Sequence, residues 1–262
     1  VQKKLTTRAM WTGTVVHRSA EVGLRRMRGR LYVDVEEATR SALWAARDDI
    51  EGSRTGRWLE RPSRNVGFRE HYYGEAIDDA TWEAALAEID RQVRALHVNR
   101  IFRRLEQVAD RILEVEELRR FPVGDAEVYV ALDVLVSDGK GGVVIIDWKT
   151  GDAHSDEVIA GQLGVYGIYA TQVLGVPDDR VKAMHVNLRH GTETMHTVGP
   201  AEIEAARAEI AASVAEMREG LVDRAENVAD PAAYPLLPEG DARCRWCSFR
   251  RSCGREGEGA KI

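Results

Sequence analysis

The sequence predicts an α/β protein in which a core of about four strands is covered by helices. Three changes of pattern along the 262 residues support this prediction. Apolar side chains recur at helical spacing through residues 78–113, alternate between two faces through residues 126–136, and return to helical spacing after residue 156. We therefore expect an N-terminal helical extension, a central mixed sheet flanked by helices, and a C-terminal cysteine module.

The N-terminal helical region is expected to cover residues 1–113. Its clearest helical stretch is residues 78–113, where Trp82, Ile89 and Leu96 are among the apolar residues that share one face. The segment from Gly52 to Gly74 is rich in Gly, Arg, Ser and Pro, which is typical of a loop.

The central region, residues 114–222, is expected to form the core. The strand at residues 126–136 is followed by the turn "SDGKGG" and a second strand at residues 143–149, so the two should pair as an antiparallel hairpin. The remaining predicted elements are a helix at 156–175, strands at 181–189 and 192–198, and a helix from Pro200 to about Gly220.

Composition restricts the class of protein. A net charge of −6 does not by itself indicate a nucleic-acid-binding protein, although arginines are dense in residues 17–30 and 99–104. Such patches either form a basic groove on an acidic protein or are solvated helix faces. No apolar run approaches the roughly 20 residues that span a bilayer. We therefore expect a cytoplasmic protein with no membrane partner.

The strand "GGVVIIDWK" ends in charged residues. Strand periodicity places Asp147 and Lys149 on one side, and the hairpin brings Asp133 alongside them. Two converging carboxylates suit Mg²⁺ or Mn²⁺, which lowers the pKa of bound water, and a lysine can stabilise charge on phosphorus. The alternative is that Asp147 and Lys149 are only the solvated end of a strand.

Further polar residues flank this strand. Gln162 and Tyr166 share a helix face at i,i+4 spacing and can contact phosphate, unless they belong to a partly buried amphipathic helix. His17, near the expected start of a helix and behind Gly13, can complete the coordination of a divalent ion, although a lone histidine is more often structural. Glu116, on the strand before Asp133, is either a further acidic member or an ordinary exposed glutamate.

Together these residues resemble the PD-(D/E)XK nuclease superfamily, and within it the RecB-like exonuclease branch. The resemblance covers about residues 9–253. The motifs in the matching order are Gly-x-x-x-His (Gly13 to His17), Glu116, Asp133, Asp-x-Lys (147–149) and Gln-x-x-x-Tyr (162–166).

The resemblance implies a restriction-endonuclease-like core and a role for each matching residue. The implied metal ligands are His17, Asp133, Asp147 and the carbonyl of Trp148. The implied catalytic amine is Lys149, supported by Gln162 and Tyr166, with Glu116 as a peripheral acidic member. The implied reaction is metal-assisted hydrolysis of a DNA phosphodiester by activated water.

The three cysteines form a separate C-terminal module at residues 223–262. Cys244, Cys247 and Cys253 have the spacing Cys-x2-Cys-x5-Cys, which favours a metal or cluster site over disulfides in a reduced protein. Zinc and iron–sulfur clusters both need four ligands. Iron–sulfur members of the branch have a fourth cysteine before Gly-x-x-x-His. No cysteine precedes Gly13 here, so a 4Fe-4S cluster would need a ligand outside the chain shown or a non-cysteine ligand, and the alternatives are a degenerate site or a zinc site.

The functional hypothesis is a divalent-metal-dependent DNA nuclease, an exonuclease or endonuclease, with single-stranded DNA as a candidate substrate and a role in repair, recombination or defence. One alternative is a non-catalytic DNA-binding or scaffold subunit of a helicase–nuclease complex. Another is a zinc-stapled subunit that is active only with its partner. The sequence has no Gly-x-x-x-x-Gly-Lys-Ser/Thr phosphate loop, so a helicase partner would have to supply any ATP motor.

Overall fold

A five-stranded mixed sheet forms the centre of the computed structural model, which describes residues 1–152 and 156–255. The α/β class is therefore confirmed, with one strand more than expected. The strand order is β3-β4-β5-β6-β7. The strands are β3 (Ile112–Val123), β4 (Ala126–Ser137), β5 (Val143–Lys149), β6 (Val181–Asn187) and β7 (Thr192–Thr197).

The pairing within the sheet brings the candidate residues to one region. β4 and β5 pair antiparallel, with Val134 opposite Ile146, which confirms the predicted hairpin. β5 and β6 pair parallel, with Asp147 opposite His185. The chain crosses between these two strands through α6 (Asp156–Ile168), which continues as a π-helical turn at Tyr169–Val173.

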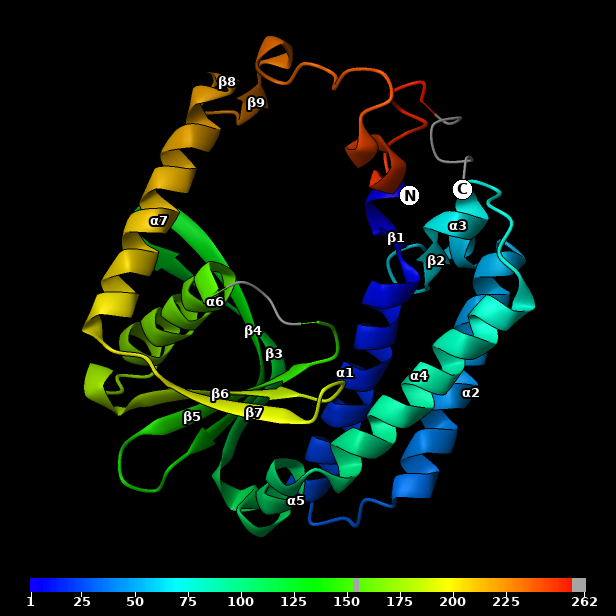
Figure 1. Ribbon diagram of the computed structural model, residues 1–262. Coiled ribbons are helices and arrows are strands. Elements are labelled where there is room, and N and C mark those ends of the chain that lie inside the picture. Colours follow the sequence, from blue (N-terminus) through cyan, green and yellow to red (C-terminus); the bar gives the residue numbers. More distant parts are fainter. Residues whose placement is uncertain (153–155, 256–262) are drawn as a thin grey trace.

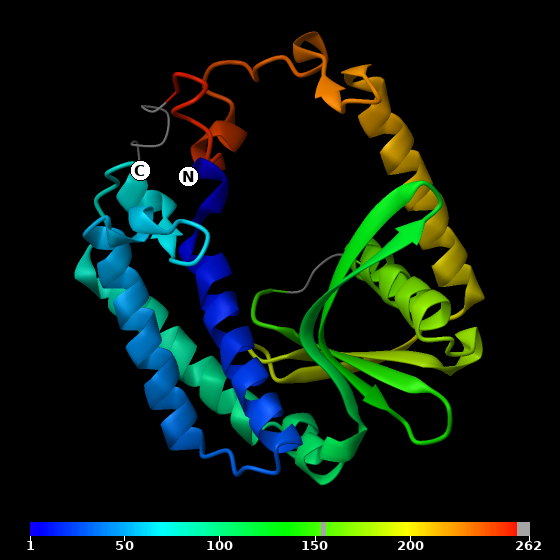
Figure 2. The same ribbon diagram turned by 180° about the vertical axis from the view of Figure 1, so that it is seen from behind.

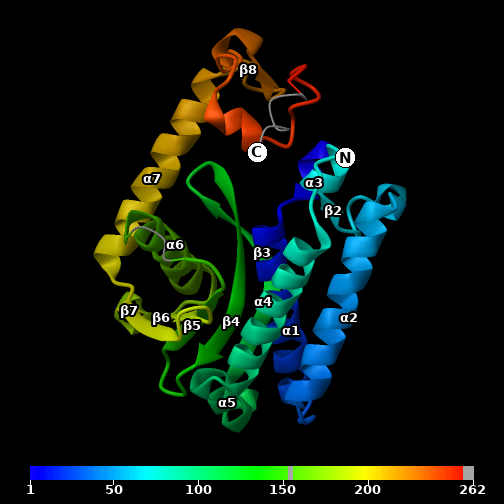
Figure 3. The same ribbon diagram turned by 45° about the vertical axis from the view of Figure 1, so that its right-hand side comes forward.

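Helices cover both faces of the sheet (Figures 1 and 3). On one face, α6 and α7 (Pro200–Glu219) pack over apolar residues that include Val143 and Ile145. On the other face, the N-terminal helices share an apolar cluster with the alternate residues Ile146 and Trp148. The N-terminal helices are α1 (Arg8–Arg28), α2 (Val35–Arg54), α3 (Arg69–Tyr72), α4 (Asp79–Val98) and α5 (Arg100–Gln107).

Two expectations for the N-terminal region were wrong in detail. α1 begins at Arg8, where the Thr7 side chain accepts a hydrogen bond from the Met10 backbone N–H, so His17 lies in the middle of the helix rather than near its start. The segment 52–74 is not one loop, because α2 extends to Arg54, and a short strand, β2 (Gly67–Phe68), pairs with β1 (Leu5–Thr6). None of the described helices is long and apolar enough to cross a bilayer.

The C-terminal segment returns to the beginning of the chain (Figure 2). After the hairpin of β8 (Leu221–Asp223) and β9 (Val228–Ala229), the chain runs to a turn at Ala242–Trp246. Ser252 Oγ donates a hydrogen bond to Gln2 Oε1 at 2.6 Å, and the Tyr73 hydroxyl donates to the Ser248 carbonyl at 2.8 Å. The first bond joins the two ends of the chain, and the second ties the C-terminal segment to the end of α3. The last seven residues of the predicted cysteine module lie outside the described part.

Candidate functional site

Three potential metal ligands from different elements meet beside the sheet. His17 Nδ1, on α1, lies 3.1 Å from Glu116 Oε1 on β3 and 3.2 Å from Asp133 Oδ1 on β4. Single ligand atoms of the three side chains all lie within 4.8 Å of one another. The strand register pairs Val115 with Val134 and Glu117 with Leu132, so Glu116 stands opposite Asp133. We call His17, Glu116 and Asp133 the His–Glu–Asp cluster.

The backbone of Glu116 is unusual. Its φ is 49°, in the left-handed region that residues other than glycine seldom occupy. Such a conformation costs on the order of 1–3 kcal/mol and persists where surrounding contacts impose it, often at functional sites. Here the bend accompanies the approach of the Glu116 carboxylate to the His17 ring. It therefore favours a functional role for Glu116.

The electrostatics of the His–Glu–Asp cluster are those of a cation site. Burial disfavours the charged imidazole, but hydrogen bonds to Asp133 and Glu116 outweigh it and raise the pKa of His17 to about 10. Burial raises the pKa of Asp133, although the neighbouring imidazolium opposes this. A proton on His17 is thus held between two carboxylates. One imidazole nitrogen and two carboxylates are a donor set that fits a divalent ion, Mn²⁺ or Mg²⁺.

A second polar cluster lies at the end of β5 under α6. Lys149 Nζ is 2.8 Å from Asp147 Oδ2 and donates to Gln162 Oε1 at 2.9 Å. The Tyr166 hydroxyl and Gln162 Nε2 both donate to Asp147 Oδ1, at 2.9 and 3.1 Å. Burial, together with the charge of Asp147, raises the pKa of Tyr166, so its hydroxyl stays a donor. We call these four residues the lysine cluster.

The two clusters adjoin at Asp133. The Trp148 backbone N–H donates to Asp133 Oδ2 at 2.6 Å, and the negative charge of Asp147 contributes to the raised pKa of Asp133. All the predicted catalytic residues are therefore brought together. Asp147 is not part of the three-residue group of mutually close ligand atoms among the described residues, and its carboxylate contacts Lys149, Gln162 and Tyr166.

An open groove of about 590 Å³ leads to the His–Glu–Asp cluster. Its walls include His17, Glu116, Arg18, which belongs to the predicted arginine-dense stretch 17–30, and Thr150, which sequence reasoning had not selected. Thr150 directly follows Lys149, so proximity to the Asp-x-Lys motif was the available signal. The groove therefore has a cationic and a hydroxyl side chain in the same lining as two of the candidate metal ligands.

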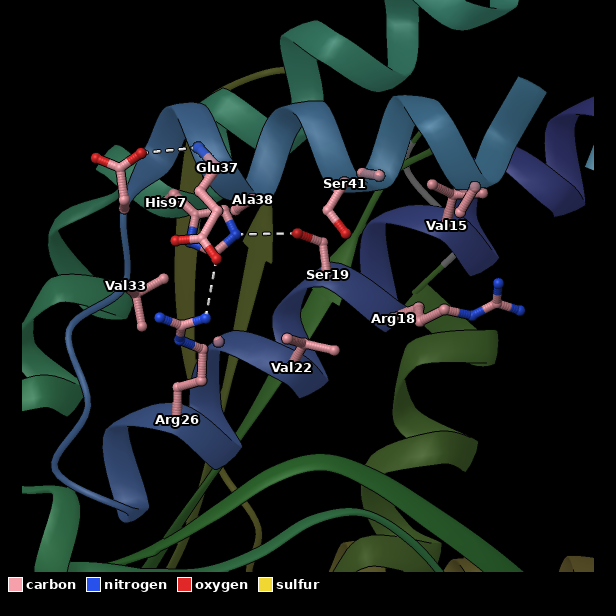
Figure 4. A pocket seen from close by; sticks show the side chains of 14 residues that line it. Val15, Arg18, Ser19, Val22, Arg26, Val33, Glu37, Ala38, Ser41 and His97 are labelled. Atoms are coloured by element: carbon pink, nitrogen blue, oxygen red, sulfur yellow. Dashed lines mark hydrogen bonds and ion pairs between the residues drawn. The ribbon is translucent and has the colours of Figure 1, made fainter. Parts of the chain in front are cut away.

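A second cavity, of about 150 Å³, is separate from the clusters and lies between α1 and α2 (Figure 4). Its walls are largely apolar, and Ser19 Oγ hydrogen-bonds His97 Nε2 there at 3.0 Å. Arg26 and Glu37 form an ion pair at 3.2 Å at this cavity. It contains none of the predicted catalytic residues.

The predicted iron–sulfur site is not supported by the structure. Cys244 is buried and Cys247 and Cys253 are half-buried, and all three are free thiols. Within residues 1–152 and 156–255, their sulfur atoms do not form a group of mutually close ligand atoms. Three dispersed thiols do not fit a centre that needs four converging ligands. The two ends of the chain are joined here by hydrogen bonds such as that between Ser252 and Gln2.

Comparison with known proteins identifies the family. The model of the PD-(D/E)XK nuclease superfamily matches residues 2–254, nearly the whole chain, so the protein belongs to this superfamily. The curated proteins give no match. Among solved structures, one described as the crystal structure of SSO0001 matches with a TM-score of 0.32 and 15% identity, covering 71% of this chain and 79% of that chain. This overlap is too loose to transfer any property.

Proposed function

We propose that the protein is a divalent-metal-dependent deoxyribonuclease of the RecB-like branch, acting as an exonuclease on single-stranded DNA. The observation that carries the proposal is the convergence of His17, Glu116 and Asp133 next to the Asp147–Lys149 pair in a chain of this superfamily. A repair, recombination or defence pathway, with a helicase as partner, is the setting that the resemblance favours.

The proposed metal ligands are His17, Glu116 and Asp133, with Asp147 and the Trp148 carbonyl as the further ligands that the resemblance implies. When bound, the divalent ion would lower the pKa of water and offset phosphate charge. His17 must release its proton to bind the ion. The positive charge of the ion would then take the place of that proton between the carboxylates of Glu116 and Asp133.

Lys149 is proposed to stabilise negative charge on the phosphate as a point charge. Its Nζ is fixed by Asp147 Oδ2 and Gln162 Oε1, so the amine has a defined position before substrate arrives. Tyr166 and Gln162 in turn orient the Asp147 carboxylate. A preset donor costs little reorganisation during the reaction.

Single-stranded DNA is proposed as the substrate because the resemblance to the RecB-like exonuclease branch favours it. The groove beside the His–Glu–Asp cluster, of about 590 Å³, has one arginine among its lining residues. Arg18 would then contact a phosphate, and Thr150 would lie next to the scissile bond.

The test is DNA cleavage in Mn²⁺ by the wild-type protein and by Asp147→Ala and Lys149→Ala. We expect cleavage of labelled single-stranded DNA from an end, lost in both variants while circular dichroism shows a retained fold. Variants that cut at the wild-type rate would refute the assignment. DNA binding without cleavage in either Mg²⁺ or Mn²⁺ would indicate a scaffold protein instead.

A further inference from the structure

The carbonyl groups of Lys149 and of the two residues after it each accept a hydrogen bond from a different donor. Two donors come from the end of β6 and therefore from the sheet itself. The third comes from α4, in the layer of N-terminal helices. The bonds are Leu188 N to Lys149 O at 2.8 Å, Gln92 Nε2 to Thr150 O at 3.0 Å and Asn187 Nδ2 to Gly151 O at 3.0 Å.

The α4 donor, Gln92, is a buried amide on an apolar helix face. Its residue is only 2% exposed and lies among Ile89, Val93 and Leu96. Burying an amide without a partner costs roughly 1–3 kcal/mol, so its hydrogen bonds matter. Nε2 donates to the Thr150 carbonyl and to Glu88, whereas Oε1 has no hydrogen-bond partner among the described residues. A carbonyl oxygen can only accept, so the amide nitrogen must face Thr150.

Thr150 is also pressed against α1. A Cβ atom added to Gly13 would lie 2.9 Å from Thr150 Oγ1, closer than packed atoms tolerate. Gly13 is one helical turn before His17, and both residues and Thr150 line the groove. Thr150 is therefore held between the turn of α1 that leads to His17 and the amide of Gln92 on α4.

We propose that Gln92 is a positioning residue for the nuclease site. Its bond to the Thr150 carbonyl fixes the end of β5 against the helical layer and so sets Lys149 relative to the His–Glu–Asp cluster. The reason is geometric: Lys149 belongs to the sheet and His17 to α1, and Thr150 is where those two elements touch. The inference rests on the proposed nuclease function.

The test compares Gln92→Met with Leu86→Met in the full chain. Methionine keeps the approximate length of glutamine but donates no hydrogen bond. Leu86→Met is the control, because it changes a buried side chain of the same helix without removing a hydrogen bond. For Gln92→Met we expect about a 10-fold lower kcat on single-stranded DNA, a KM within threefold, and Mn²⁺ affinity within threefold. Amide hydrogen exchange in residues 149–152 should become faster. Leu86→Met should match the wild-type protein in all four.

The inference is overturned if kcat of Gln92→Met stays within twofold of wild type, or if exchange in residues 149–152 is unchanged. It is also overturned if kcat, Mn²⁺ affinity and the thermal midpoint fall together, since that pattern is general destabilisation. Asp133→Asn, assayed in parallel, separates the two levels of the proposal. If Asp133→Asn cleaves DNA at the wild-type rate, the assigned active site is wrong, and if the wild-type protein does not cleave DNA in Mn²⁺, the nuclease function is wrong. If Asp133→Asn loses cleavage but Gln92→Met cleaves at the wild-type rate, the positioning role is wrong.

Discussion

The His–Glu–Asp cluster and the lysine cluster are assembled in opposite ways. The lysine cluster lies within Asp147 to Tyr166, on one strand and the helix that follows it. The His–Glu–Asp cluster draws on α1, β3 and β4, with about a hundred positions between its first two members. The first depends on local spacing, whereas the second depends on how the N-terminal helices dock on the sheet. Single substitutions should therefore be able to perturb the amine of Lys149 and the metal ligands separately.

The largest expected effect is at Asp133, where the two clusters meet. Asp133→Asn keeps an oxygen that can accept from the Trp148 N–H, so the fold should survive. It removes the carboxylate charge next to His17, and we expect cleavage to fall on the order of 10³-fold, because metal-assisted stabilisation contributes several kcal/mol. Steady-state cleavage rates in Mn²⁺ measure this. A loss below tenfold would separate Asp133 from the metal site.

Low pH should reduce the free energy of unfolding through His97, a buried histidine of α4. Burial, reinforced by Arg103, lowers the pKa of His97 to about 4, from 6.5. Between pH 4 and pH 6.5, His97 is therefore protonated in the unfolded chain but neutral in the folded chain. The free energy of unfolding should therefore fall as pH drops from 6.5 towards 4, by up to about 3 kcal/mol. Urea denaturation across this pH range measures it, and His97→Gln should flatten the dependence. An equal slope in His97→Gln would contradict the assignment.

On the other side of the sheet, two glycines of α6 provide a matched pair. A Cβ at Gly164 would lie 2.7 Å from the Glu202 carbonyl oxygen and 2.4 Å from Ala206 Cβ, so Gly164→Ala should force α6 and α7 apart and cost about 1–3 kcal/mol. At Gly161 the nearest atom is the flexible Glu209 carboxylate at 3.4 Å, so Gly161→Ala should be neutral or stabilising by up to about 1 kcal/mol. Thermal unfolding of both variants checks this, and equal midpoints would be inconsistent with close helix contact.

A smaller effect is expected at Tyr166. Tyr166→Phe removes one of the two donors to Asp147 Oδ1 but leaves Gln162 in place, so we expect about a 10-fold lower kcat, equivalent to one hydrogen bond to a charged group. The control is Tyr169→Phe, which loses a bond to the buried Glu114 outside the lysine cluster and should stay within threefold. Equal losses in the two variants would mean that helix packing, not the orientation of Asp147, matters.

Local periodicity predicted much of the fold and the lysine cluster. The alternation in residues 126–136 and the glycine turn indicated the hairpin, period two placed Asp147 and Lys149 together, and i,i+4 spacing joined Gln162 to Tyr166. These are short-range relations that a chain carries in its own pattern.

Long-range features of the site were less visible in the sequence. The left-handed backbone at Glu116 has no sequence signature, because glutamate seldom adopts it, and its approach to His17 follows from the docking of α1. The proposed positioning role of Gln92 depends on which element packs against α4, which the sequence does not show. The sequence does show a single amide on an otherwise apolar face of that helix. Three cysteines with suitable spacing suggested a cluster, but spacing alone does not make ligand atoms converge.

The place of Glu116 is tested most directly by titrating the protein with Mn²⁺ and measuring affinity calorimetrically for Glu116→Gln and for Glu117→Gln. Glu117 is the adjacent residue of β3 and pairs with Arg119 rather than with His17. If Glu116 is a metal ligand, Glu116→Gln should bind Mn²⁺ about 10–100-fold more weakly than wild type, with Glu117→Gln within twofold. Wild-type affinity in Glu116→Gln would contradict the His–Glu–Asp cluster as the metal site.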